Sequence, residues 1–288
     1  MAVNTGSPVH MKHRFGPLIL ALATALAASA SAQAADFRVT VEPSFPRGQA
    51  AEVYQPLLDY LGQATGHRFE LHVPSNYHAL WREIRIDSAV DFAFEEAHFT
   101  DYRAKRTGFT PLVRTIEPTR FSLIAMPHVA DEGANGLIGH RVVSMPAPSL
   151  GSAVLGEVYP NPIAQPEIES SAASWRDGVE MVFADEAEAA MVPNYIADLY
   201  PNLLPISESR AFPGRAFSAA PMVPEDVRAA VREALLALDQ QDELYTLLAE
   251  LGISGFVDAE PGEYDGNDEM LRGFFGFKAA PVAYDAGN

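Results

Sequence analysis

Short apolar segments alternate with amphipathic segments along most of this sequence, and that order limits the folds open to the chain. Asp91-Phe92-Ala93-Phe94 is an apolar run led by an acid, and Glu188-Ala189-Ala190-Met191 repeats the pattern later. Each run follows two predicted strands and two predicted helices. Continuous apolar runs are typical of buried parallel strands, and their alternation with helices predicts an α/β fold. We therefore expect two similar lobes with mixed, mostly parallel sheets.

The predicted elements fall into two cycles with connecting strands between them. Strands are predicted at 37–41, 69–73, 89–94, 110–116, 120–126, 141–144, 167–170 and 188–192. Helices are predicted around 53–61, 80–84, 153–158, 175–182, 224–238 and 244–251. The stretches near 110–126 and 205–220 are expected to cross between the lobes as a two-strand hinge. This order assigns 35–118 and 213–288 to a discontinuous first lobe and 119–212 to a second.

The N-terminus has the composition of a secretory signal peptide. Lys12 and Arg14 precede an apolar stretch at 15–28, and Ala32-Gln33-Ala34 is a small-x-small cleavage site. The apolar stretch is too short to span a bilayer comfortably. Residues 1–34 are therefore predicted to be removed near Ala34 on export to the periplasm, whether translation starts at Met1 or Met11.

Charge and cysteine content exclude several classes of function. The chain carries a net charge of −18, and no basic cluster offsets it, so nucleic acid and anionic lipid are not expected partners. It has no cysteine, so an exported domain of this kind depends on its core rather than on disulfides. The sequence also lacks a Gly-x-Ser-x-Gly elbow, a His-Glu-x-x-His motif and a phosphate-binding P-loop. We predict that the protein is not an enzyme and needs no cofactor.

Several segments, in order and spacing, resemble the phosphate/phosphite/phosphonate (PhnD-like) substrate-binding proteins of ABC transporters. The segments that carry the resemblance are 54–61 with Thr65-Gly66, Tyr77 ahead of Leu80, 89–94, 137–143 and 225–238. The resemblance covers most of the chain and implies the two-lobed type II periplasmic binding protein fold. It also implies a small oxyanion or phosphonate-like ligand, bound between lobes that close by hinge motion.

The resemblance also suggests where ligand donors lie. Ser149, Gly151 and Ser152 follow a predicted strand where the family carries a serine-rich loop, whose hydroxyls and helix N-terminus donate to phosphonate oxygens. Tyr77 matches the tyrosine that faces the ligand. Asn194 and Tyr195 lie in the loop predicted to follow the 188–192 strand, and we include them among the candidate ligand-binding residues.

Glu95, Glu96 and His98 follow the 91–94 strand, where the family commonly has a glycine-proline turn. In one interpretation they contact the ligand and read its other end, which favours a cationic or amine-bearing group. In another, the two acids lie in the first turn of a helix, where the helix dipole favours them. In a third, they are metal ligands together with Glu42 or Met145, although their spacing matches no known metal motif.

These observations predict a periplasmic solute-binding protein that delivers its ligand to an ABC permease in the inner membrane. We expect a monomer that binds a small molecule. Two alternatives remain at this point: a binding protein for a metal ion or metal chelate, with Glu95, Glu96 and His98 as ligands, and a ligand-sensing partner of a membrane receptor kinase.

Overall fold

The computed structural model describes residues 1–6 and 34–279 of the 288-residue chain. Most of the predicted signal peptide lies outside the described residues. Residues 1–34 form a unit separate from Ala35–Asn288, and the second unit contains all the named strands and helices. Within the described ranges, no helix is long and apolar enough to cross a membrane.

The first sheet has six strands in the order β11-β4-β10-β3-β1-β2. Its strands are β1 (Asp36–Val41), β2 (Arg68–His72), β3 (Phe92–Glu95), β4 (Thr110–Thr115), β10 (Ala216–Ala219) and β11 (Phe256–Asp258). β1 pairs in parallel with β2 and β3, whereas β10 runs antiparallel to β3 and β4. β3 is buried along its whole length, which explains the unbroken apolar run that predicted it.

The second sheet has five strands in the order β7-β6-β8-β5-β9. Its strands are β5 (Phe121–Ala125), β6 (Arg141–Val143), β7 (Glu167–Glu169), β8 (Ala189–Pro193) and β9 (Leu204–Glu208). β6 is parallel to β7 and β8, while β5 is antiparallel to β8 and β9. Both sheets thus repeat one plan, in which three parallel strands are joined by an antiparallel strand that directly follows a crossing between the sheets. The predicted two-lobed α/β fold is confirmed.

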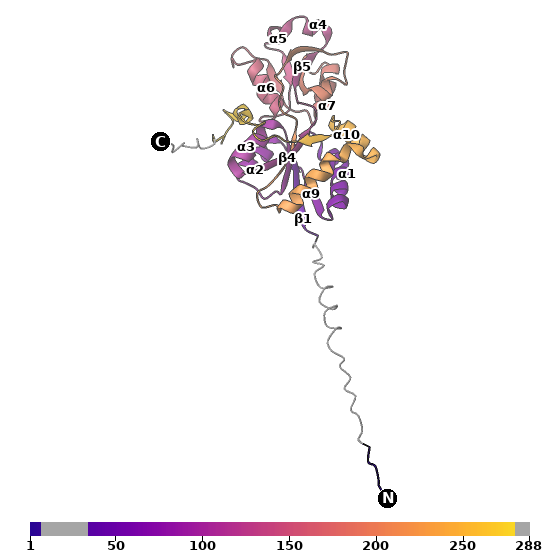
Figure 1. Ribbon diagram of the computed structural model, residues 1–288. Coiled ribbons are helices and arrows are strands. Elements are labelled where there is room, and N and C mark those ends of the chain that lie inside the picture. The colour runs from indigo at the N-terminus through magenta and orange to yellow at the C-terminus, as the bar shows by residue number, and fades with distance from the viewer. Residues whose placement is uncertain (7–33, 280–288) are drawn as a thin grey trace, which may run out of the picture. The chain divides into compact units, whose positions relative to one another are not determined.

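Helices cover both sheets. Those of the first lobe are α1 (Arg47–Thr65), α2 (Tyr77–Arg85), α3 (Ala97–Thr107), α9 (Glu225–Leu236) and α10 (Tyr245–Leu251). Those of the second lobe are α4 (Pro127–Ala130), α5 (Gly133–Gly136), α6 (Leu150–Val158), α7 (Trp175–Phe183) and α8 (Asn194–Ala197). Figure 1 shows α4–α7 with β5 at one end of this unit and α1, α2, α3 and α9 at the other.

Some predicted boundaries were wrong by a turn. The helix predicted at 153–158 begins at Leu150, because the side chain of Ser149 caps it by accepting from the Ser152 amide. Asn194 and Tyr195, predicted to lie in a loop, begin the one-turn helix α8. The short helix α5 lies between the strands predicted at 120–126 and 141–144, where no helix was predicted. The limits proposed for the two lobes remain predictions, although β5–β9 all lie in the second sheet.

The chain passes between the sheets twice, at 116–120 and at 209–215. The two crossing segments are hydrogen-bonded to each other, since Thr119 and Phe212 exchange backbone bonds of 3.1 and 2.8 Å. Gly214 lies at their closest approach, where a Cβ would overlap the carbonyl oxygen of Thr115 and stand 2.7 Å from that of Glu117. Only glycine fits there without moving one crossing segment away from the other.

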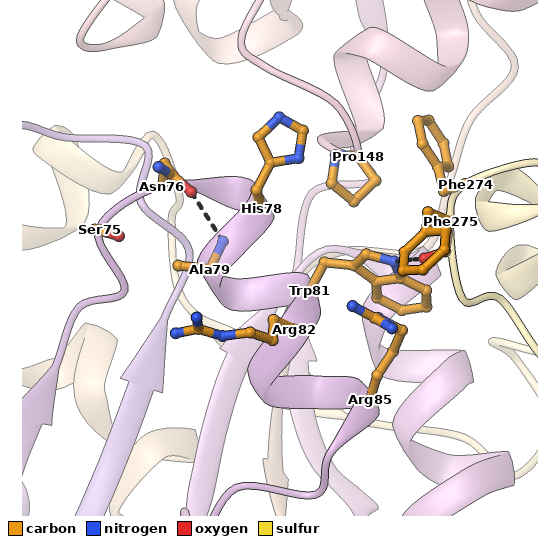
Figure 2. A pocket seen from close by; sticks show the side chains of 10 residues that line it. All are labelled: Ser75, Asn76, His78, Ala79, Trp81, Arg82, Arg85, Pro148, Phe274 and Phe275. Carbon is orange, nitrogen blue, oxygen red and sulfur yellow. Dashed lines mark hydrogen bonds between the residues drawn. The ribbon is translucent and has the colours of Figure 1, made fainter.

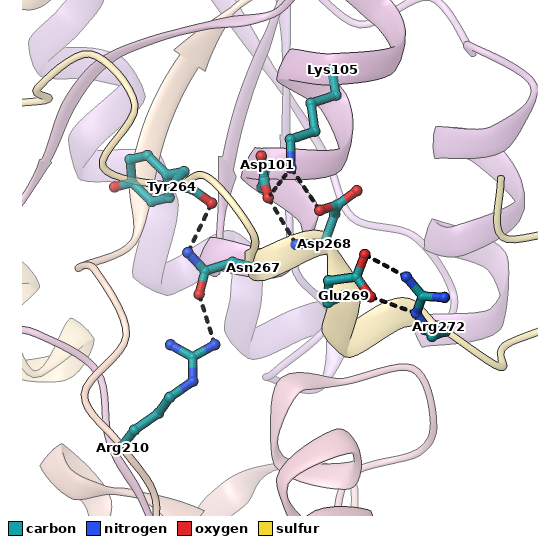
Figure 3. A network of polar contacts seen from close by, with 8 residues as sticks. All are labelled: Asp101, Lys105, Arg210, Tyr264, Asn267, Asp268, Glu269 and Arg272. Atoms are coloured by element: carbon teal, nitrogen blue, oxygen red, sulfur yellow. Dashed lines mark hydrogen bonds and ion pairs between the residues drawn. The ribbon is translucent and has the colours of Figure 1, made fainter. Parts of the chain in front are cut away.

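The C-terminal segment fastens the second crossing segment to α3 (Figure 3). In the 3₁₀ turn at Asn267–Leu271, Asp268 joins Asp101 and Lys105 of α3, with Lys105 Nζ 2.9 and 2.7 Å from the carboxylates of Asp101 and Asp268. Asn267 accepts a 3.0 Å hydrogen bond from Arg210, and the Tyr264 hydroxyl donates to the Gly214 carbonyl at 2.6 Å. The segment therefore bridges the first lobe and the second crossing.

The apolar core is divided in an unexpected way. One cluster lies between the first sheet and helices α1, α9 and α10. The other contains side chains of α2 and α3, including Trp81, Phe99 and Tyr102, together with the core of the second lobe. The face of the first lobe that carries α2 and α3 is thus continuous with the second lobe in this arrangement.

Replacing Gly214 with alanine is expected to destabilise the protein, because the new Cβ overlaps the opposite crossing segment. Overpacking of this kind costs about 1–3 kcal/mol of the free energy of unfolding. Urea denaturation followed by circular dichroism measures it. Gly156→Ala is the matched control: Gly156 lies in α6, and a Cβ added there would meet nothing within 4 Å, so this variant should gain about 0.5–1 kcal/mol. Equal stability of Gly214→Ala and wild type would contradict this account of the hinge.

Candidate functional site

Polar side chains gather beyond the carboxyl ends of the parallel strands of the first sheet. Glu42 follows β1, Tyr77 begins α2 after β2, and Glu96 follows β3. All three are at most 8% exposed. One oxygen of Glu42 accepts from the Glu96 amide at 2.6 Å, and the other accepts from the Tyr77 hydroxyl at 3.1 Å. Ligands of open α/β sheets bind at this edge, so these side chains form the floor of a candidate site.

The two carboxylates of this floor resist ionisation. Burial, followed by the proximity of Glu96, raises the pKa of Glu42 well above its ordinary value. Burial also raises the pKa of Glu96, against the opposing effects of the Arg215 guanidinium and the Thr119 hydroxyl. Glu42 and Glu96 are both buried, and Arg215 is a cation that lies near both of them. A ligand cation beside the two acids would favour their ionised forms and would itself be stabilised.

That one cation, Arg215, connects the floor to the second lobe. It lies just before β10, is 7% exposed, and donates from Nη2 to the carbonyl of Leu251. Its Cζ is 5.1 Å from the centre of the Phe94 ring and 5.0 Å from that of Tyr195, which follows β8. Burial raises the pKa of the Tyr195 hydroxyl. Tyr195 also packs on Gly252, where a Cβ would stand 2.5 Å from its side chain.

His98 joins the two lobes directly. It lies in the first turn of α3, is fully buried, and its Nε2 is 2.9 Å from the carbonyl oxygen of Pro148, in the loop between β6 and α6. Burial lowers the pKa of His98 to about 3, an effect that the bond to Pro148 only partly opposes. The imidazole is therefore neutral at ordinary pH, and Nε2 carries the proton that it donates to Pro148.

The loop predicted to hold an oxyanion lies beside this contact. Ser149 is fully buried; its hydroxyl donates to the Met145 carbonyl at 3.0 Å and accepts from the Ser152 amide at 3.2 Å. Gly151 packs under Trp175, whose ring would be 2.8 Å from an added Cβ. Ser152 is half-buried. The start of α6, with Ser152 in its first turn, therefore follows directly on the contact between Pro148 and His98.

Two predicted residues have structural partners. Glu95 is the last residue of β3 and forms a buried, two-pronged ion pair with Arg103, at 2.8 and 2.9 Å. Asn194 accepts from the Arg120 amide at 3.1 Å and donates from its own amide to the Arg120 carbonyl at 2.8 Å, which ties α8 to the start of β5. These contacts hold the Glu95 side chain to Arg103 and the Asn194 side chain to the backbone of Arg120.

Comparison with known proteins identifies the family. Residues 39–264 match the sequence profile of the family described as "ABC transporter, phosphonate, periplasmic substrate-binding protein". The chain belongs to this family. Its members are substrate-binding proteins rather than enzymes, and the type II periplasmic binding protein fold is the one observed here. A comparison with curated protein sequences gives no match.

Solved structures with this fold include binding proteins of phosphonate transporters. A binding protein component of an ABC phosphonate transporter from Pseudomonas aeruginosa superposes with a TM-score of 0.68 at 14% identity, over 80% of this chain and 83% of that chain. PhnD1 from Prochlorococcus marinus, in complex with methylphosphonate, gives 0.68 at 12% identity, over 82% and 97%. A Xanthomonas citri protein bound to ATP gives 0.61 at 14% identity, over 82% and 95%. At such identities the likeness concerns the fold.

The geometry of this phosphonate-family binding protein gives the metal alternative no support. Glu95 is turned to Arg103, the Glu96 amide to Glu42, and His98 to Pro148. In the part of the chain that the structure describes, no group of three or more His, Asp or Glu side chains is arranged to hold a metal ion. The alternative in which Glu95 and Glu96 occupy the first helical turn was wrong: Glu95 ends β3 and Glu96 is the N-cap of α3.

Sequence reasoning missed Arg215 and gave Glu42 only a minor part. Arg215 stands at the start of a short apolar segment, Ala216-Phe217-Ser218-Ala219, and a lone cation before a buried strand is a usable signal. Glu42 follows β1 as Glu96 follows β3, so their equivalence can be read from the strand pattern. Arg215 lies near Glu42 and Glu96 because the strand that follows it, β10, inserts between β3 and β4. The sequence did not predict that position of β10 in the sheet.

The buried His98 is expected to make stability depend on pH. Its pKa falls from 6.5 in the unfolded chain to about 3 in the folded protein, so the unfolded state binds more protons between these values. Stability from this residue is therefore complete above pH 6.5 and is lost as the pH falls. Between pH 7.5 and 5.5 the loss is about 1 kcal/mol of the free energy of unfolding.

His98→Gln keeps an amide donor near Pro148 and removes the titration. The difference between the two proteins isolates His98, since their carboxylates titrate alike. Urea denaturation at pH 7.5 and 5.5 should show a smaller decrease for His98→Gln than for wild type. His78→Gln, at an exposed position on α2, is the control and should follow wild type. Parallel pH profiles for wild type and His98→Gln would contradict the assignment.

Proposed function

We propose that this protein binds a small phosphonate-like oxyanion with a cationic amine at its other end, in the cleft between the two lobes. The phosphonate end lies at the start of α6, and the amine faces Glu96. Closure of the lobes around the ligand presents it to an ABC permease in the inner membrane, with a monomer as the binding unit. Family membership supports the phosphonate class, and the polar side chains of the cleft support the amine.

The observation that supports an amine on the ligand is the missing hydrogen-bond donor to the Glu96 carboxylate. Its Oε2 atom is buried and has no hydrogen-bond partner among the described residues. A buried carboxylate oxygen without a donor is costly, and an ammonium group is a donor that also supplies the missing positive charge. Glu42 and Tyr77 hold the Glu96 backbone in position through the 2.6 and 3.1 Å bonds. A ligand that carried only negative charge would instead add to the repulsion in this floor.

The oxyanion end has a different set of donors. The first amides of a helix have no partner within the helix, and the dipole there favours negative charge. In α6 these amides belong to Leu150 and Gly151, and the hydroxyl of Ser152 lies in the same turn. Ser149 supports the turn rather than the ligand, because its hydroxyl is already bonded to Met145 and Ser152. Tyr77 and Tyr195 supply the aromatic cover, one from each lobe.

The connections between the lobes support closure by hinge motion. Two hydrogen-bonded crossing segments and one C-terminal bridge leave a rotation about the crossing as the simplest relative motion. The bond between His98 and Pro148 spans the lobes on the α6 side and supports the closed form.

A matched pair of ligands tests the proposal: methylphosphonate and aminomethylphosphonate differ by one amine. Isothermal titration calorimetry of wild type is expected to show at least tenfold tighter binding of aminomethylphosphonate, because an ion pair in a desolvated site is worth about 1.4 kcal/mol or more. Glu96→Gln should lose most of this preference. Glu180→Gln, an exposed glutamate on α7, should retain it.

Two outcomes would contradict the proposal. Equal affinity of wild type for the two phosphonates would remove the role of the amine. Tight binding of neither, with strong binding of an amine that lacks an oxyanion, would remove the role of α6. A thermal-shift series with phosphonates, phosphate and simple amines provides the ranking.

A further inference from the structure

A cavity of about 510 Å³ lies beside α2, outside the acidic floor of the cleft (Figure 2). Its walls come from three parts of the chain: α2 with the residues before it, Pro148 of the second lobe, and Phe274 and Phe275 of the C-terminal segment. Its size is in the range of small-molecule sites. Tyr77 and His78 are neighbours in sequence, but Tyr77 is buried and bonds to Glu42, while His78 is exposed and lines this cavity.

The charge of this cavity is opposite to that of the protein. His78, Arg82 and Arg85 all line it from α2, with Arg82 on the side of Ser75 and Asn76 and Arg85 on the side of Trp81 and Phe275 (Figure 2). Among the described residues that line it, none is acidic, although the whole chain carries a net charge of −18. A concentration of positive charge in a concave site on an acidic protein focuses anions there.

Arg85 is held in place by aromatic rings rather than by an acid. Its Cζ lies 5.6 Å from the centre of the Trp81 ring and 5.4 Å from that of Phe275. The Trp81 indole donates to the Phe275 carbonyl at 2.8 Å, which fixes one ring relative to the other. The Nε atom of Arg85 is buried and has no hydrogen-bond partner within the described residues. Stacking on the faces of the rings leaves the in-plane N–H groups of the guanidinium as donors.

Arg82 is exposed and forms no hydrogen bond or ion pair through its side chain with any described residue. The Asn76 side chain uses its oxygen to cap α2, accepting from the Ala79 amide at 2.8 Å, so its amide group remains a donor. Ser75 adds a hydroxyl at the same end. The cavity thus combines two guanidinium groups with neutral donors and an aromatic shelf.

We propose that this cavity is a second binding site, for a soluble polyanion of the diphosphate type, distinct from the ligand site in the cleft. Arg85 binds phosphoryl oxygens at the aromatic end of the cavity, and Arg82 and Asn76 bind them at the other end, with His78 as a further donor. Pro148 belongs to the loop that His98 holds in the closed form. An anion that contacts this wall favours closure, and by linkage closure strengthens its binding. The site is therefore an effector site that senses which form the lobes adopt.

Calorimetric titration of the full mature protein with inorganic pyrophosphate tests this proposal. Wild type is expected to bind, and the double variant Arg82→Gln, Arg85→Gln should bind at least tenfold more weakly. Because Arg85 packs against two rings, the single variant Arg82→Gln, at an exposed side chain, is measured as well and should lose about threefold or more. Arg47→Gln, at an exposed arginine at the start of α1 that does not line the cavity, should bind as wild type does.

Ser152→Ala distinguishes this cavity from the cleft. It removes a hydroxyl proposed to contact phosphonate and should leave pyrophosphate affinity within twofold. Absence of pyrophosphate binding to wild type would overturn the proposal. So would an affinity that the arginine variants leave unchanged or that Ser152→Ala lowers as much as they do, since the anion would then bind elsewhere. Aminomethylphosphonate binding measured without pyrophosphate reports on the cleft, so a failure of one site can be told from a failure of the other.

Discussion

The candidate site depends on a charge imbalance: two buried carboxyl groups, Glu42 and Glu96, lie near the guanidinium of Arg215. Burial of unpaired charge is expensive, so each group is held by neutral partners as well. Tyr77 and the Glu96 amide bond to Glu42, while Arg215 donates to Leu251 and packs on Phe94. The Oε2 atom of Glu96 is left without a hydrogen-bond donor among the described residues. The ammonium group of the ligand that we propose would supply this donor and a second positive charge.

The topology explains why these groups meet. Each sheet contains three parallel strands and receives an antiparallel strand from across the hinge, β10 in the first and β5 in the second. The exchange creates the two crossing segments, and Arg215 lies on one of them, directly after Gly214. The cation of the site is therefore part of the hinge.

The fold was largely predictable from the sequence, whereas the site was predictable only in part. The apolar runs at 91–94 and 188–192 located β3 and β8, because a strand buried on both faces leaves a clear pattern. The positions of Glu96, Tyr77 and Ser152 at strand or helix ends followed from the same pattern. The ion pair between Glu95 and Arg103 could not be predicted from this pattern, because Arg103 lies two helical turns further along the chain. Arg215 came from the far end of the chain, and no local pattern connects it to Glu42.

The most direct test of the account is a crystal structure of the mature protein with aminomethylphosphonate. The account predicts the phosphonate oxygens at the amides of Leu150 and Gly151 and at the Ser152 hydroxyl. It predicts the ammonium within about 3.2 Å of a Glu96 oxygen, with the lobes closed around the ligand. A phosphonate group turned toward Glu42 and Glu96, or a ligand bound outside the cleft, would contradict it.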